Sequence, residues 1–223
     1  MVLIIGIDDA GRGPLIGPMI LAGVLITKSQ EDLFKKNKIT DSKLVKHSER
    51  IKMAKLIREN SIKYKVVKAY PKEIDNSIKS RVNLNTLEAI KTAEIINFLN
   101  NKKEKIKVIV DCPSVNIEAW KRTLLEFVEN KSNLEIYCEH KADLNHVSVS
   151  AASILAKVTR EEEISLLKKQ YGDFGSGYPA DENTIKFLKE NGQKLENSGS
   201  IRKTWATWKA LFPEKNQASL KDF

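Results

Sequence analysis

Four aspartates stand where predicted strands or helices begin or end, and carboxylates so placed could perform metal-dependent chemistry. Asp8 and Asp9 follow the apolar run 2–7, Asp111 follows the apolar run 106–110, and Asp143 precedes a long helical pattern. The ends of adjacent strands converge at one edge of a sheet, and a helix N-terminus stabilises nearby anions. Each acid alone could equally be a surface aspartate or a helix cap. Their common placement predicts one shared site.

The chemistry of this predicted site follows from its donor atoms. Carboxylate oxygens without a cluster of histidine or cysteine favour Mg²⁺ or Mn²⁺ over Zn²⁺. His140 and His146 flank Asp143, but we interpret them as polar neighbours rather than metal ligands. Two such ions about 4 Å apart can bind the attacking and leaving oxygens of a phosphodiester. The pattern therefore predicts phosphodiester hydrolysis.

The glycine-rich stretch GIDDAGRGPLIGP resembles a phosphate-binding loop only superficially. Its glycines at 11, 13 and 17 miss the spacing of the dinucleotide motif by one position, and no G-K-[ST] follows. Two carboxylates in the same loop would also repel a phosphate unless a cation lay between them. A nucleotide cradle is thus disfavoured, and the metal site is favoured.

The elements that must position these residues alternate between strand and helix patterns. Strands are expected at 2–7, 19–26, 62–69, 106–110 and 134–138, and helices at 48–60, 85–99, 117–128 (with Asn116 as N-cap) and about 148–170. This order predicts an α/β fold with a mixed sheet flanked by helices.

The character of the sequence changes after Tyr171. Glycine and proline crowd positions 172–179, and only short helical patterns follow, around 184–189 and 204–211. We expect a catalytic core at 1–172 and a small C-terminal helical appendage, 173–223, packed on that core.

Composition bounds the class of protein. The 223 residues carry a net charge of +9, which favours a nucleic-acid partner, and 41% hydrophobic residues suit a globular domain. No apolar run approaches the roughly 18 residues that would span a bilayer, so we expect no membrane association. The N-terminus lacks the features of a signal peptide, and we expect a cytoplasmic protein with reduced Cys112 and Cys138.

Several motifs together resemble the ribonuclease HII family, and they span nearly the whole chain. They are GIDDAGRGPLIGPM, the DSK at 41–43, the strand-end Asp111, the HKAD ending at Asp143, SAASILAKVTR at 150–160 and GSGYP at 175–179. The resemblance implies a ribonuclease-H-like fold with a five-stranded mixed sheet, Mg²⁺ or Mn²⁺ in a two-ion site, and a monomer. It also implies cleavage of the RNA strand of RNA–DNA hybrids and of ribonucleotide-containing duplex DNA. Cleavage would fall on the 5′ side of a ribonucleotide and leave a 3′-hydroxyl and a 5′-phosphate.

The resemblance also assigns roles to residues. Asp8, Asp9, Asp111 and Asp143 match the four metal-binding acids. Gly11, Arg12 and Gly13 match the loop whose backbone reads the 2′-hydroxyl, and Tyr178 matches the tyrosine that packs on the adjacent sugar. Glycine on each side of Arg12 would allow the close approach that reading a 2′-hydroxyl requires. Arg12 could hold a phosphate with two parallel bonds, and Lys43 could add a point charge or remain a solvated lysine.

One residue departs from the family pattern, in which the second acid of the opening motif is ordinarily glutamate. Asp9 is shorter by one methylene, so its carboxylate is withdrawn by about 1.5 Å, which the strict geometry of Mg²⁺ tolerates poorly. Metal preference and rate are therefore open. Two alternatives are kept: a hybrid-binding protein with weak catalysis, and a two-metal DNA repair endonuclease.

Overall fold

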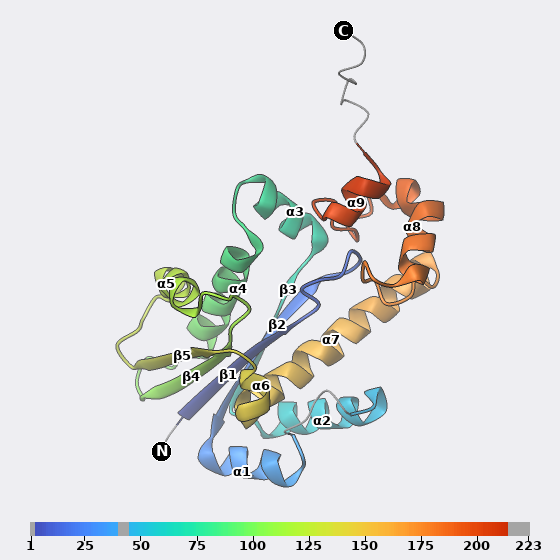
Figure 1. Ribbon diagram of the computed structural model, residues 1–223. Coiled ribbons are helices and arrows are strands. Elements are labelled where there is room, and N and C mark those ends of the chain that lie inside the picture. The colour runs from blue at the N-terminus through green and yellow to red at the C-terminus, as the bar shows by residue number, and fades with distance from the viewer. Residues whose placement is uncertain (1–2, 40–44, 214–223) are drawn as a thin grey trace.

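A mixed five-stranded sheet forms the centre of the molecule (Figure 1), as the sequence predicted. The computed structural model describes residues 3–39 and 45–213. The strand order is β3-β2-β1-β4-β5, in which β1 pairs antiparallel with β2 and parallel with β4. The strands are β1 Leu3–Ala10, β2 Met19–Thr27, β3 Lys63–Ala69, β4 Ile106–Asp111 and β5 Leu134–Glu139.

The central strand β1 is longer than the sequence predicted. Its pairing with β4 ends at Ile7, but its pairing with β2 continues through Asp8 and Asp9 to Ala10. The two acids therefore belong to the strand rather than to the turn after it. One side of the strand is no longer paired there, and this opening lets neighbouring carboxylates share one space.

Helices cover both faces of the sheet. Most predicted helices are present within about two residues, and Asn116 caps its helix by accepting a hydrogen bond from the Ala119 N–H at 3.0 Å. Sequence analysis did not predict α1, α3 and α6. The helices are α1 Lys28–Lys36, α2 His47–Asn60, α3 Pro71–Lys79, α4 Leu84–Leu99, α5 Ile117–Phe127, α6 Ala142–Asn145, α7 Val147–Tyr171, α8 Glu182–Leu195 and α9 Ala206–Leu211.

The missed helices α1 and α3 are only nine residues long each, but they have clear start signals. Thr27 and Gln30 form a capping box at the start of α1, and Pro71 occupies the first turn of α3. Each helix is shorter than the window of about 11–18 residues over which helical periodicity is read, so periodicity alone did not reveal it.

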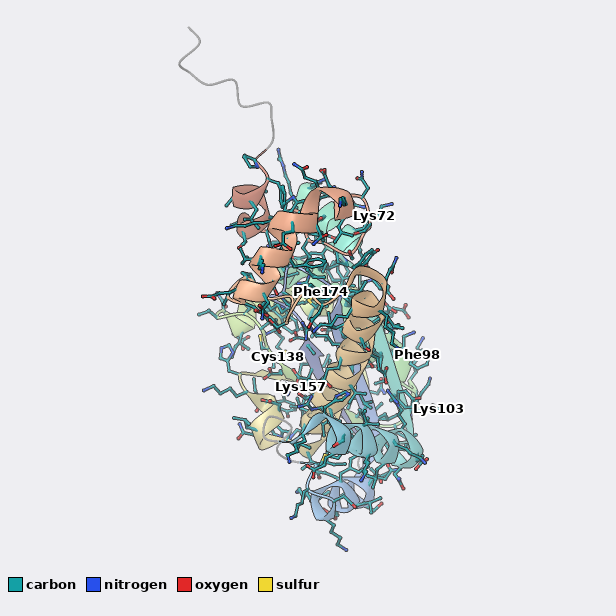
Figure 2. All side chains as sticks on the ribbon, turned by 90° about the vertical axis from the view of Figure 1, so that its right-hand side faces the viewer. Lys72, Phe98, Lys103, Cys138, Lys157 and Phe174 are labelled. Carbon is teal, nitrogen blue, oxygen red and sulfur yellow. The ribbon has the colours of Figure 1, made fainter. Side chains whose placement is uncertain are left out.

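The apolar core is divided by the sheet into two clusters. One cluster lies between the sheet and α3, α4 and α5, and the other lies between the sheet and α1, α2 and α7. Helix α7 crosses β1 so closely that a Cβ atom at Gly6 would lie 2.1 Å from the Ser148 carbonyl carbon. Figure 2 shows α7, with Lys157 on it, running along this face toward Phe174.

The C-terminal segment has an apolar cluster of its own. This cluster also includes Leu15 and Ile16, from the loop between β1 and β2. Its other buried members come from beyond residue 172: Phe174, Phe187, Leu188, Ile201 and Trp208. The segment thus packs on the glycine-rich loop. None of the helices in the described part of the chain is long and apolar enough to cross a membrane.

Candidate active site

Three of the predicted acids meet in one small cavity at the end of β1. Asp8, Asp9 and Asp111 line a cavity of about 10 Å³, enough for about one water molecule. The buried Asp8 accepts a hydrogen bond from the Asp9 backbone N–H through Oδ1 at 2.7 Å. Glu88 on α4, which sequence analysis did not select, lines the same cavity.

Burial and mutual repulsion disfavour the charged forms of these acids. Burial, followed by the negative charge of Asp9, raises the pKa of Asp8 well above its usual value. Burial also raises the pKa of Asp9 to about 6, against the opposing effect of the Arg12 guanidinium. For Glu88, burial and the charge of Asp9 raise the pKa to about 8. A cation in the cavity would relieve both penalties.

Asp143 lies beside this group rather than in the wall of the cavity. It is buried in the short helix α6, whose first residue, Ala142, donates its N–H to Asp111 Oδ1 at 2.7 Å. This bond fixes α6 to the end of β4. The structure therefore brings Asp8, Asp9 and Asp111 together. Asp143 directly follows Ala142, the residue whose N–H contacts Asp111.

The donor set suits a hard divalent ion, because every candidate ligand is a carboxylate oxygen. Within the described residues, no three acidic, histidine or cysteine side chains are already arranged around a common metal position. Asp8 is engaged with Ser153 and the Asp9 N–H, and Asp111 with the Ala142 N–H. Because a carboxylate has two oxygens with about four acceptor positions, these hydrogen bonds can persist beside metal contacts.

The loop after β1 brings Gly11, Gly13 and Tyr178 together. Gly11 has φ +80°, and a Cβ atom there would lie 2.6 Å from Arg160 Cδ. A Cβ atom at Gly13 would lie 3.6 Å from the Tyr178 ring. The Arg160 guanidinium stands 5.1 Å from the centroid of that ring. Both glycines therefore face side chains from α7 or from the segment after it.

Arg202 holds the backbone of the loop between β1 and β2 through hydrogen bonds to its carbonyl oxygens. The side chain is fully buried, and its guanidinium donates hydrogen bonds to the carbonyl oxygens of Gly11 at 2.6 Å, Arg12 at 2.5 Å and Gly17 at 3.0 Å. Trp205 Nε1–H donates to the Gly13 carbonyl at 3.1 Å. Burial lowers the pKa of Arg202 to about 9. The C-terminal segment thus sets the shape of the loop.

Of the two basic side chains predicted to bind substrate, Arg12 and Lys43, the structure describes only Arg12. The Arg12 guanidinium turns toward α4, where it donates to Glu88 Oε2 at 2.5 Å and to Asn85 Oδ1 at 2.6 Å. These two bonds use two of the five N–H donors of the guanidinium, so the assignment of Arg12 to a phosphate stays a prediction. Lys43 lies outside the described residues.

Sequence analysis missed Glu88 and Arg202, and the signals for them were unequal. Glu88 is a charged residue among the apolar positions of the helix 85–99, which is a recognisable pattern. Arg202 lies in a polar segment with no periodicity, so nothing in the sequence indicated its burial. His146 Nε2 lies 2.8 Å from Glu139 Oε2, and His140 Nδ1 lies 3.2 Å from the Cys112 carbonyl oxygen.

Buried carboxylates at the end of the central strand of a mixed five-stranded sheet define a metal-dependent nuclease of the ribonuclease-H-like class. Residues 5–208 match the family model described as Ribonuclease HII. The ribonuclease HII of Methanocaldococcus jannaschii is 36% identical, with 98% of each chain covered. That of Pyrococcus furiosus is 38% identical, with 98% of this chain and 96% of that protein covered. The chain belongs to the ribonuclease HII family.

Solved structures agree with this assignment. The ribonuclease H2 of Pyrococcus horikoshii superimposes with a TM-score of 0.84 at 35% identity, covering 94% of this chain and 96% of that one. A ribonuclease HII from Archaeoglobus fulgidus, solved as a complex with PCNA, gives 0.80 at 36% identity, covering 99% and 100%. The predicted family and fold are confirmed, and the chain is a metal-dependent endoribonuclease of the ribonuclease H type.

Proposed function

We propose that this protein hydrolyses the RNA strand of RNA–DNA hybrids and cuts on the 5′ side of single ribonucleotides embedded in duplex DNA. The products would carry a 3′-hydroxyl and a 5′-phosphate. The observation that carries the proposal is the shared cavity of Asp8, Asp9 and Asp111 directly before the loop of Gly11 and Gly13. Carboxylates for metal-assisted hydrolysis thus adjoin a backbone that a ribose can approach closely.

We assign the four acids Asp8, Asp9, Asp111 and Asp143 as ligands of two Mg²⁺ or Mn²⁺ ions. Such ions supply an activated water and stabilise the charge that develops on the phosphate oxygens. The chain's own part is to exclude bulk water around Asp8 and to hold the carboxylates at a fixed position on a buried strand. Besides burial, repulsion from neighbouring carboxylates contributes to the raised pKa values of Asp8 and Asp9, and bound ions would neutralise this repulsion.

We assign substrate recognition to Gly11, Arg12, Gly13, Lys43 and Tyr178. The ring of Tyr178 beside Gly13 offers a flat surface for a sugar next to the loop. The backbone of the loop would read the 2′-hydroxyl, which distinguishes RNA from DNA. Arg12 holds the loop against α4 through Glu88 and Asn85, and its further N–H donors would meet a phosphate.

One assay on three matched labelled duplexes tests the proposal. One strand is all RNA, contains a single ribonucleotide, or is all DNA, and each is incubated with Mg²⁺ or Mn²⁺. We expect cleavage of the first two and none of the third. Equal cleavage of the all-DNA duplex would favour a DNA repair endonuclease. Binding of the hybrid without cleavage under any metal condition would favour the catalytically weak binding protein.

Asp8→Asn provides the matched inactive control. The substitution keeps the size of the side chain but removes a charge from the cavity, so cleavage should be lost while the fold persists. Circular dichroism of the Asp8→Asn variant would check that it has folded. Near-normal turnover in this variant would exclude the assigned role of Asp8.

We further propose that the chain acts as a monomer that can dock on a sliding clamp of the PCNA type. The similarity to the Archaeoglobus fulgidus protein, solved in complex with PCNA, supports this proposal. We also propose the division into a core at 1–172 and an appendage at 173–223, which the separate apolar cluster of the C-terminal segment supports. Size-exclusion chromatography with light scattering, with and without PCNA, measures both the monomer and the complex.

A further inference from the structure

Helix α4 carries a buried carboxylate, Glu88, that the four-acid centre does not use. Its side chain is only 2% exposed, and the residues beside it, Leu87 and Ala89, belong to the apolar core. A buried ionisable group is costly unless its oxygens find partners. Both carboxylate oxygens of Glu88 therefore need hydrogen-bond partners.

The first oxygen, Oε2, is satisfied by the glycine-rich loop. It accepts a hydrogen bond from Arg12 Nη1 at 2.5 Å, while Arg12 Nη2 donates to Asn85 Oδ1 at 2.6 Å. Asn85 and Glu88 are three residues apart, so they lie on the same face of α4. This face grips the Arg12 side chain and thereby one end of the loop.

The second oxygen, Oε1, is buried and has no hydrogen-bond partner in the described part of the chain. Glu88 lines the same cavity as Asp8, Asp9 and Asp111. A buried acceptor left without a donor costs about 1–3 kcal/mol. Apart from Thr92, the other lining groups are carboxylates, apolar side chains and Trp120, whose indole N–H already donates to the Asn85 carbonyl oxygen. A ligand that enters the cavity is therefore the natural donor.

A hydrated divalent ion supplies such a donor. Mg²⁺ usually keeps several of its waters when it binds to a protein, and these waters donate hydrogen bonds to carboxylates outside the coordination sphere. The cavity has room for about one water beside the three aspartates. An acceptor at the position of Glu88 would orient that water.

We propose that Glu88 is a positioning residue that links the metal centre to the substrate loop. Its Oε1 accepts a hydrogen bond from a water bound to the metal ion, while its Oε2 holds Arg12. The inference rests on the proposed assignment of Asp8, Asp9 and Asp111 as metal ligands. It adds a fifth carboxylate to the centre, outside the coordination sphere.

Glu88→Gln is the sharpest test, because the amide has nearly the same shape as the carboxylate. The amide oxygen pairs most strongly with the charged Arg12 guanidinium, so the N–H₂ group is left facing the water, which is itself a donor. Asn85→Ala is the matched control, since it removes the other contact of Arg12 and lies outside the lining of the cavity. Asp8→Asn removes a direct ligand.

The readout is Mn²⁺ binding to the full chain without substrate, measured by calorimetry and by the electron paramagnetic resonance of free Mn²⁺. We expect Glu88→Gln to weaken binding about 10-fold, as loss of an outer-sphere partner commonly does. The Mn²⁺ affinity of Asn85→Ala should stay within about 2-fold of that of the unmodified chain, because Asn85 does not line the cavity. Unchanged Mn²⁺ affinity in Glu88→Gln, with the loss expected in Asp8→Asn, would overturn the role of Glu88. Unchanged affinity in Asp8→Asn would instead overturn the metal centre itself.

A second measurement needs no variant. In a crystal of the unmodified chain soaked in MnCl₂, we expect a water within hydrogen-bonding distance of both an Mn²⁺ ion and Glu88 Oε1. An ion bound to the aspartates without such a water would overturn the proposal, even if Glu88→Gln failed to fold.

Discussion

Arg202→Met should destabilise the protein by removing the support of the glycine-rich loop. The guanidinium is the donor for three carbonyl oxygens, those of Gly11, Arg12 and Gly17. Methionine has a similar length and fills much of the same volume, but it offers no donor. The bonds to Gly11 and Gly17 are fully buried, so water cannot readily replace the lost donor.

The expected magnitude follows from the number of carbonyls left unpaired. Each buried acceptor without a donor costs about 1–3 kcal/mol. Replacing a buried charge by an apolar group can itself be favourable, but that gain is seen when its polar partners are replaced as well. Here the carbonyls remain in place. We therefore expect the free energy of unfolding to fall by at least about 3 kcal/mol, from three acceptors at the lower end of that range.

Urea unfolding of the full chain, followed by circular dichroism, measures this loss. Arg122→Met on α5 is the control, because Arg122 is exposed and its replacement should change the free energy of unfolding by less than about 0.5 kcal/mol. Turnover by Arg202→Met should also fall, because the loop that would meet the substrate loses the donor for three of its carbonyl oxygens. A loss of stability no larger than that of Arg122→Met would refute the reasoning.

Three further predictions concern single carboxylates. Asp8→Asn should raise the melting temperature of the metal-free chain, because burial and the charge of Asp9 raise the pKa of Asp8; calorimetry in EDTA that shows a lower value would contradict this. Asp9→Glu should increase the cleavage rate with Mg²⁺ relative to Mn²⁺, and an unchanged ratio would mean that the backbone already compensates for the shorter side chain. Hydrogen bonds from the Ser176 backbone lower the pKa of Asp181 from 3.8 to about 2, so its stabilising effect is present above 3.8 and is lost as the pH falls toward 2. Asp181→Asn should therefore flatten the acid-unfolding curve of the chain in that interval, and an unchanged slope would argue against this role.

The sequence by itself determined the features that depend on local pattern. Apolar runs marked the strands of the sheet, and short-range capping marked the start of α5 at Asn116. The aspartates at 8, 9 and 111 could be chosen because strand ends meet at one edge of a sheet, whatever the details of packing. Their meeting in one cavity agrees with that rule.

Only the tertiary structure decided which side chains complete the site. Whether β1 stopped before Asp8 depended on its pairing with β2, and the direction of Arg12 depended on α4, more than 70 residues later in the chain. Glu88 and Arg202 reach the site through contacts between segments far apart in sequence, such as the bond from Arg202 to the Gly11 carbonyl, with a separation of 191 residues. Local propensity carries no information about such partners, because burial and hydrogen bonding are set by the packing of the whole chain.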